Sequence, residues 1–146
     1  MNPKWAYWVH GSVMSHFHTQ LSSQLLVLAE NDDLASAANV IQVQLIGPTI
    51  TEMPPVTYYN YTLLARLKIE VDPTFLYRQT SLHGLIANTF GDILCRQTDV
   101  ALTPRLGCLM RLTPIKVTPL GDRKDRGKLV NLSTISAEYE IQLEDS

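Results

Sequence analysis

The sequence predicts an α+β fold, with an antiparallel sheet of roughly four to six strands and two main helices packed on one face of it. Segments 58–71 and 135–143 alternate apolar and polar residues, as strands with one buried face do. Segments 3–20 and 74–96 repeat apolar residues at steps of three and four, as amphipathic helices do. Short polar loops join consecutive strand segments, and this favours antiparallel pairing.

Composition indicates a globular protein that is somewhat poor in charge. Of the 146 residues, 45% are hydrophobic and 18% are charged. A chain of this length can bury a core without disulfides or metals, so we expect a single domain over residues 1–146. The net charge of −2 gives no global field that would attract nucleic acid or an anionic membrane. There is no apolar run of about 18 residues and no signal peptide, so we expect a protein made and kept in a cytosol, without membrane contact.

The first expected element is a helix over residues 3–20. Asn2 can cap it, and Pro3 fits the first helical position. Its apolar stripe consists of Trp5, Trp8, Val9, Val13, His16 and Phe17. The apolar run 25–28 is either a strand or the end of a helical segment, and 30–39 is predicted to be a loop.

Two strands and a connector are expected next. The first strand begins at Val40 and ends at Gly47-Pro48. Residues 49–56 form a connector, in which Pro54-Pro55 excludes both regular helix and central strand. The strand 58–71 is about twice the usual length. We expect its 63–71 half at the centre of the sheet.

The second half of the chain contains one helix and further strands. Asp72-Pro73 opens the helix 74–96, within which Gly84 and Gly91 each cost about 1 kcal/mol relative to alanine. Residues 97–105 are predicted to form a loop, and 106–112 a strand. This strand can continue past Pro114 with a changed phase, as an edge or bulge. The charged stretch 121–128 is predicted to be a turn, and 135–143 the last strand.

No catalytic or metal-binding motif is present. His16 and His18 are two residues apart and therefore point away from each other on a helix. No strained Gly-x-Ser-x-Gly elbow and no phosphate-binding glycine loop occurs. We therefore expect no catalytic residue, no metal and no cofactor, and we do not expect an enzyme. Cys95 and Cys108 are expected to be reduced, buried thiols, with a disulfide as the alternative.

Two groups of residues are candidates for contact with a partner. Tyr58 and Leu64 are apolar residues on the polar parity of their strand, which is a mild sign of an interface. The stretch 121–128 is the one local concentration of basic residues; a solvated hairpin tip is the simplest interpretation, and protein docking or DNA-backbone contact are alternatives. The candidate contacts are Tyr58, Tyr59, Tyr61, Leu64, Arg123, Lys124, Arg126 and Lys128.

Four fragments, in this order, resemble one known family. They are NPKWAYWVHGSVMSHF, LIGPTITEMPPVTYYNYTLLARLKIEV, LGCLMRL and SAEYEIQL. Together they resemble small tailed-bacteriophage virion proteins of the neck and tail-terminator type. The resemblance spans most of the chain, although its motifs are short and none is catalytic. The stretch 22–39 departs from the family, because it lacks the basic and aromatic character of the family's first loop.

The resemblance implies an α+β subunit whose copies form a ring of about six at the junction between tail tube and head. Such a ring caps the tail-tube protein, docks to the head–tail connector or adaptor protein, and lets DNA pass through its bore without sequence readout. It would be assembled in the host cytoplasm and reside in the neck of the virion. We expect the 58–61 half of the long strand to contact the next subunit.

Three other functions are also compatible with the sequence. A head-closure or tail-completion protein of the neck fits the same residues. From a different class, the chain could be a small ligand-binding or enzymatic α+β domain, with a pocket lined by His83, Cys95 and the tyrosines. Nucleic-acid binding as the main role is the third alternative.

Overall fold

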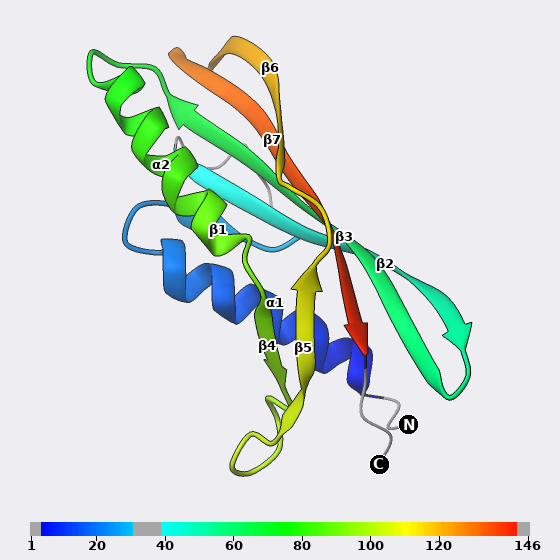
Figure 1. Ribbon diagram of the computed structural model, residues 1–146. Helices are drawn as coiled ribbons and strands as arrows, with labels where there is room; N and C mark the ends of the chain where they lie inside the picture. The colour runs from blue at the N-terminus through cyan, green and yellow to red at the C-terminus, as the bar shows by residue number, and fades with distance from the viewer. Residues whose placement is uncertain (1–3, 31–38, 143–146) are drawn as a thin grey trace.

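Figure 1 shows the computed structural model, which describes residues 4–30 and 39–142. In chain order the elements are α1 (Trp5–Leu21), β1 (Leu26–Leu28), β2 (Val40–Met53), β3 (Val56–Glu70), α2 (Phe75–Thr89), β4 (Ile93–Arg96), β5 (Arg105–Arg111), β6 (Lys116–Asp125) and β7 (Lys128–Gln142). The α+β class and the two main helices are confirmed. The predicted cap at Asn2 and Pro3, and most of the predicted loop 30–39, lie outside the described residues.

The sheet is larger than predicted and mixed in direction. In the described residues it has seven strands, in the order β1-β2-β3-β7-β5-β4, and β6 also pairs with β7. β1 is parallel to β2, while the other pairs are antiparallel. The prediction of a purely antiparallel sheet of at most six strands was therefore wrong. A strand as short as β1 has no periodicity that could fix its type or its direction.

The strand β7 organises the sheet. It pairs with β3 along almost its whole length, from Tyr58 opposite Gln142 to Glu70 opposite Val130. Its other edge is shared by β5, near the C-terminal end, and β6, near the N-terminal end. From β5 to β6 the chain advances five residues, Arg111 to Lys116, while β7 advances three, Tyr139 to Ser136. The two extra residues around Pro114 leave the side-chain parity unchanged, because Leu109 and Val117 both lie opposite odd-numbered residues of β7. The predicted change of phase past Pro114 was therefore wrong.

Both helices pack against one face of the sheet, as predicted. A single core cluster contains Trp8, Val9, Val13, Phe17 and Leu21 of α1, Leu82 and Ile86 of α2, and odd-numbered residues of β3 and β7. In Figure 1 the two helices cover the same side of the long strands. Phe17 meets Phe90, just after α2, edge to face with ring centroids 5.3 Å apart.

The second helix ends earlier than predicted. It stops at Thr89, and residues 93–96 form β4, so the prediction of helix over 74–96 was wrong beyond residue 89. Ile93 and Cys95 are buried while Leu94 is exposed, which is the two-residue period of a strand. Just before β4, Asp92 Oδ1 accepts a hydrogen bond from the Arg111 backbone N–H at 3.0 Å.

The predicted connector 49–56 is in fact a continuation of the hairpin. Residues 49–53 pair with 56–60, and Pro54-Pro55 forms the turn, where their missing N–H groups interrupt no ladder. The predicted strand end at Gly47-Pro48 is a bulge, because one extra residue separates Ile46 and Thr49 relative to the partner strand. Gly47 has φ of +126°, and a Cβ there would lie 2.9 Å from the Asn60 carbonyl oxygen.

The last hairpin is also longer than predicted. Residues 116–125 form β6, so the expected 121–128 turn is reduced to Arg126-Gly127, whose φ angles of 53° and 82° suit a tight two-residue hairpin turn. β7 begins at Lys128 and not at 135. The first part of β7 was missed because the buried side chains switch from even to odd positions along the strand. Val130, at an even position, is buried, whereas from Ser133 to Ile141 the odd-numbered residues are buried.

Candidate subunit interface

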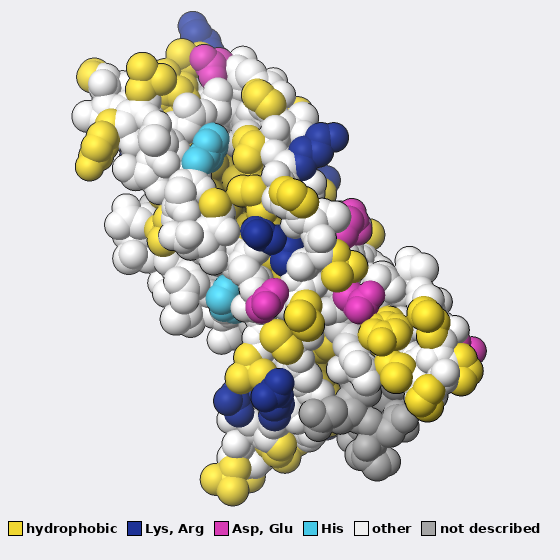
Figure 2. Space-filling view, viewed as in Figure 1, with side chains coloured by type: hydrophobic (Ala, Val, Ile, Leu, Met, Phe, Trp, Pro, Cys, Tyr) yellow, Lys and Arg dark blue, Asp and Glu magenta, His cyan; other side chains and the backbone are white. Residues whose placement is uncertain are grey.

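The hairpin of β2 and β3 projects from the body of the molecule, and we call residues 47–60 the arm. In Figure 1 its tip lies beyond the helices, at the lower right. Apolar side chains are exposed along it, with Ile50 56% and Met53 62% exposed, and Figure 2 shows hydrophobic atoms gathered there. Soluble monomers seldom leave such a patch uncovered, so the arm is a candidate contact surface.

The inner side of the arm is anchored to the first helix. The rings of Trp5 and Tyr59 lie 4.4 Å apart between centroids. Tyr59 is 5% exposed and Tyr61 4%, so both belong to the core of the subunit and have little surface for a partner. Burial raises the pKa of Tyr61. Of the candidate contacts on β3, Tyr58 and Leu64 therefore remain available, because they are half-buried on the opposite face.

On the sheet face turned away from the helices, Glu138 and Glu140 lie near the C-terminal end of β7, and we call the surface around these two carboxylates the acidic face. Glu138 Oε2 accepts a hydrogen bond from Thr62 Oγ1 at 2.9 Å, and Glu140 Oε2 accepts one from Asn60 Nδ2 at 3.3 Å. Both carboxylates are thus held by neutral donors. Apolar residues also lie on this surface: Ile46 of β2, opposite Thr62; Tyr58 and Leu64 of β3; Met110 of β5, opposite Glu140; and Leu112 just beyond β5.

The turn between β6 and β7 carries the basic residues, and we call residues 120–129 the basic hairpin. Arg123, Lys124, Arg126 and Lys128 are all exposed there. Leu120 and Leu129 flank them, 60% and 41% exposed. The predicted hairpin tip is confirmed.

The two aspartates of the basic hairpin are engaged inside the subunit. Asp122 Oδ1 accepts a hydrogen bond from Asn131 Nδ2 at 2.7 Å. Asp125 forms an ion pair with Lys68, whose side chain is 1% exposed. The hydrogen bond from Lys68 lowers the pKa of Asp125. Across the described residues, no ion pair involves Arg123, Lys124 or Arg126.

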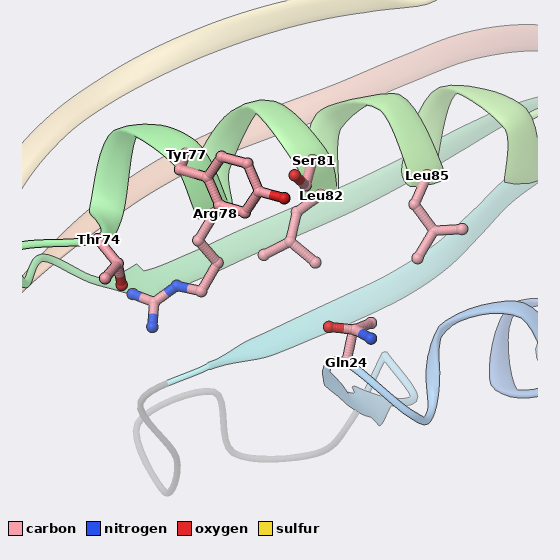
Figure 3. Close-up of a pocket in the computed structure, with 7 residues that line it drawn as sticks. All are labelled: Gln24, Thr74, Tyr77, Arg78, Ser81, Leu82 and Leu85. Atoms are coloured by element: carbon pink, nitrogen blue, oxygen red, sulfur yellow. The ribbon is translucent and has the colours of Figure 1, made fainter.

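A groove lies alongside the second helix. Its volume is about 560 Å³, and its lining consists of Gln24, Thr74, Tyr77, Arg78, Ser81, Leu82 and Leu85. Figure 3 shows Arg78, Leu82 and Leu85 pointing from α2 toward the side where Gln24 lies. Arg78 is held by Asp72, 3.1 Å away, and by the Glu70 carbonyl oxygen. The groove is lined by neither His83 nor Cys95, which the alternative of a ligand-binding domain would place in its pocket.

The cysteines are free thiols, as predicted. Cys95 lies opposite Gly107, and Cys108 lies opposite Leu94, so the two side chains point to opposite faces of the β4–β5 pair. Burial raises the pKa of Cys95 to about 12, so this thiol stays protonated at neutral pH. Cys108 is only half-buried.

In the part of the chain that the structure describes, the histidines and carboxylates do not converge on a metal or catalytic site. His16 Nε2 lies 2.9 Å from the Thr89 carbonyl oxygen, where it links α1 to the end of α2. Burial lowers the pKa of His83. Within residues 4–30 and 39–142, no three His, Cys, Asp or Glu side chains cluster as metal ligands would. No helix in that part of the chain is long and apolar enough to cross a membrane.

Comparison with known proteins finds likeness in structure alone. No family model and no curated protein sequence matches the chain. A chain of the virion of a native gene transfer agent particle has a similar structure, with a TM-score of 0.57 and 9% identity over 99% of this chain and 100% of that one. A second solved structure, described without a function, gives a TM-score of 0.50 and 12% identity over 93% and 96%. The fold is therefore shared from end to end with a virion protein.

Sequence reasoning missed several residues of these surfaces. Ile50 and Met53 were placed in a connector because of Pro54-Pro55, whereas the structure pairs them with Tyr59 and Val56 in the hairpin. Glu138 and Glu140 were recognised only as the polar side of a strand. Their position on one face of β7 was readable from the alternation, whereas their apolar neighbours on β5 depend on the tertiary pairing.

Proposed function

We propose that the chain is a structural subunit of a tailed-phage-like virion: a tail terminator that forms a ring at the head–tail junction, without catalytic activity. The observation that carries the proposal is the match in fold, over nearly all of both chains, to a chain of a gene transfer agent virion. The ordered resemblance of four sequence fragments to tail-terminator and neck proteins supports it independently.

The exposed surfaces support a role in assembly. The arm presents Ile50 and Met53 to solvent, and the acidic face and basic hairpin add further exposed apolar side chains. Surfaces of this kind are covered in an assembly. In the proposed ring, copies of this chain contact one another, the tail-tube protein on one rim and the connector or adaptor protein on the other. DNA passes through the bore without sequence readout.

The position of the ring in the neck of the particle distinguishes a tail terminator from a head-closure or tail-completion protein. A head-closure or tail-completion protein shares the resemblance and would use the same surfaces, but would meet different partners. A cryo-EM reconstruction of the neck of particles that contain this chain tests the difference. We expect its density as a ring directly on the last tail-tube ring. Density next to the portal, with another protein between it and the tube, would reassign it to head closure, and its absence from particles would refute a virion role.

A further inference from the structure

We propose that the basic hairpin of one copy docks on the acidic face of the next copy, and that this head-to-tail contact builds the ring. The inference rests on the proposed function, and it names the two surfaces that would meet. Arg123, Lys124 and Arg126 would then face Glu138 and Glu140 of the neighbour.

The two surfaces cannot meet within one subunit. They lie near opposite ends of the same strand, with Lys128 at the start of β7 and Glu140 near its end. At about 3.3 Å per residue, the strand holds them roughly 30–40 Å apart. In Figure 1 the β6–β7 turn lies at the top of the molecule and the other end of β7 lies below, beside the root of the arm. Only another molecule can bring the two charges together.

The charges of the two surfaces are complementary. The two aspartates of the basic hairpin bind Asn131 and Lys68, so the charge that the hairpin presents outward is positive. Glu138 and Glu140 accept hydrogen bonds from a threonine and an asparagine, and in the described part of the chain neither forms an ion pair. Lys116 lies opposite Ser136, one rung from Glu138, but no ion pair between Lys116 and Glu138 is formed.

The apolar residues of the two surfaces also match. Leu120 and Leu129 flank the basic side chains, while Met110 and Leu112, 53% and 54% exposed, border the carboxylates. Charged pairs surrounded by apolar contacts fix the register of an interface and disfavour wrong partners. Because the two surfaces differ, the contact is heterologous, and it closes into a ring when the rotation between copies divides the circle.

Charge-reversal variants test the contact. The hairpin variant carries Lys124→Glu and Arg126→Glu, and the face variant carries Glu138→Lys and Glu140→Lys. Each variant alone places like charges against each other, so we expect its self-association to weaken about tenfold or more. An equimolar mixture restores opposite charges at every contact, so it should assemble as well as the wild type, in rings of alternating copies. Sedimentation velocity and native mass spectrometry measure both.

Controls separate the possible failures. Arg105→Glu reverses an exposed base outside both surfaces and should assemble normally. Circular dichroism verifies that each variant folds; if a reversed variant does not, Lys124→Gln with Arg126→Gln replaces it. Wild-type association should also weaken as salt screens the pairs.

The outcomes also distinguish the contact from the ring itself. If the wild type forms rings and the charge-reversed variants assemble equally well, this contact is wrong but the proposed function stands. The same holds if the wild type forms rings and the equimolar mixture stays dissociated. Failure of the wild type to associate even at low salt would overturn both the contact and the ring.

Discussion

Lys68 shows how a single residue connects the core to the basic hairpin. Its side chain is 1% exposed and ion-paired with Asp125, across the strand β7 that separates β3 from β6. Removing the carboxylate would leave a buried ammonium group without this partner, which is more costly than losing an exposed pair. The pair therefore holds the hairpin in place while Arg123, Lys124 and Arg126 are exposed.

The pH dependence of this pair is a testable consequence. The pKa of Asp125 is lowered in the folded protein, so its contribution to stability is present above the ordinary value of about 4 and is lost as pH falls through the lowered pKa. We expect Asp125→Asn to lower the Tm at pH 7 and to flatten the fall of Tm between about pH 5 and pH 2. An unchanged Tm at pH 7 would show that the pair does not stabilise the fold.

Tyr58 and its neighbour Tyr59 separate assembly from folding. Tyr58 is half-buried on the acidic face, whereas Tyr59 is 5% exposed and its ring packs at a tilt against that of Trp5. We expect Tyr58→Lys to change the free energy of unfolding by about 1 kcal/mol or less, and to abolish assembly because it sets a positive charge against the basic hairpin of the next copy. Tyr59→Ala should cost about 3 kcal/mol or more, because it opens a core cavity. Urea denaturation measures the change in stability, and light scattering measures assembly. Rings formed by the Tyr58→Lys variant would contradict this role.

At the scale of elements, alternation predicted the long strand and the helix faces well. It failed where the alternation is interrupted. The bulge at Gly47-Pro48 was interpreted as the end of a strand, and the switch of buried positions within β7 prevented the prediction of its first half. The stretch 93–96 was assigned to the preceding helix, because a four-residue strand offers too short a period to contradict it. The parallel pairing of β1 depends on tertiary contacts that local pattern does not encode.

Two glycines of the chain give a matched pair of stability tests. A Cβ at Gly47 would meet the Asn60 carbonyl oxygen, and its φ of +126° disfavours any other residue, so Gly47→Ala should cost about 1–3 kcal/mol. Gly84 lies in α2 with nothing within 4 Å of an added Cβ, so Gly84→Ala should stabilise by up to about 1 kcal/mol. Chemical denaturation measures both. Equal effects of the two substitutions would contradict the bulge geometry.

The arm can be tested as an element. Ile50 and Met53 are more than half exposed, so replacing both with serine removes little that the isolated subunit buries. We expect Ile50→Ser with Met53→Ser to leave the Tm of the monomer within a few degrees and to weaken assembly about tenfold or more. Analytical ultracentrifugation measures the association. Assembly at wild-type strength would show that the arm tip lies outside the contacts.

At the scale of the whole molecule, the exposed surfaces lie at its two ends. The arm and acidic face gather toward one end, and the basic hairpin lies at the other. A subunit with two different, complementary binding surfaces forms a ring or a filament when it associates. The ring closes when the rotation between neighbouring subunits divides the circle. The sequence alone could not locate these ends, because their separation follows from the way β7 pairs with β3, β5 and β6.

The most direct test of the ring is the mass and shape of the purified wild-type chain. Native mass spectrometry, with negative-stain electron microscopy of the same sample, should show closed rings of about six copies with a central opening. A chain that stays monomeric at the highest soluble concentration and low salt, with no rings on the grid, would contradict the proposal that the chain assembles into a ring.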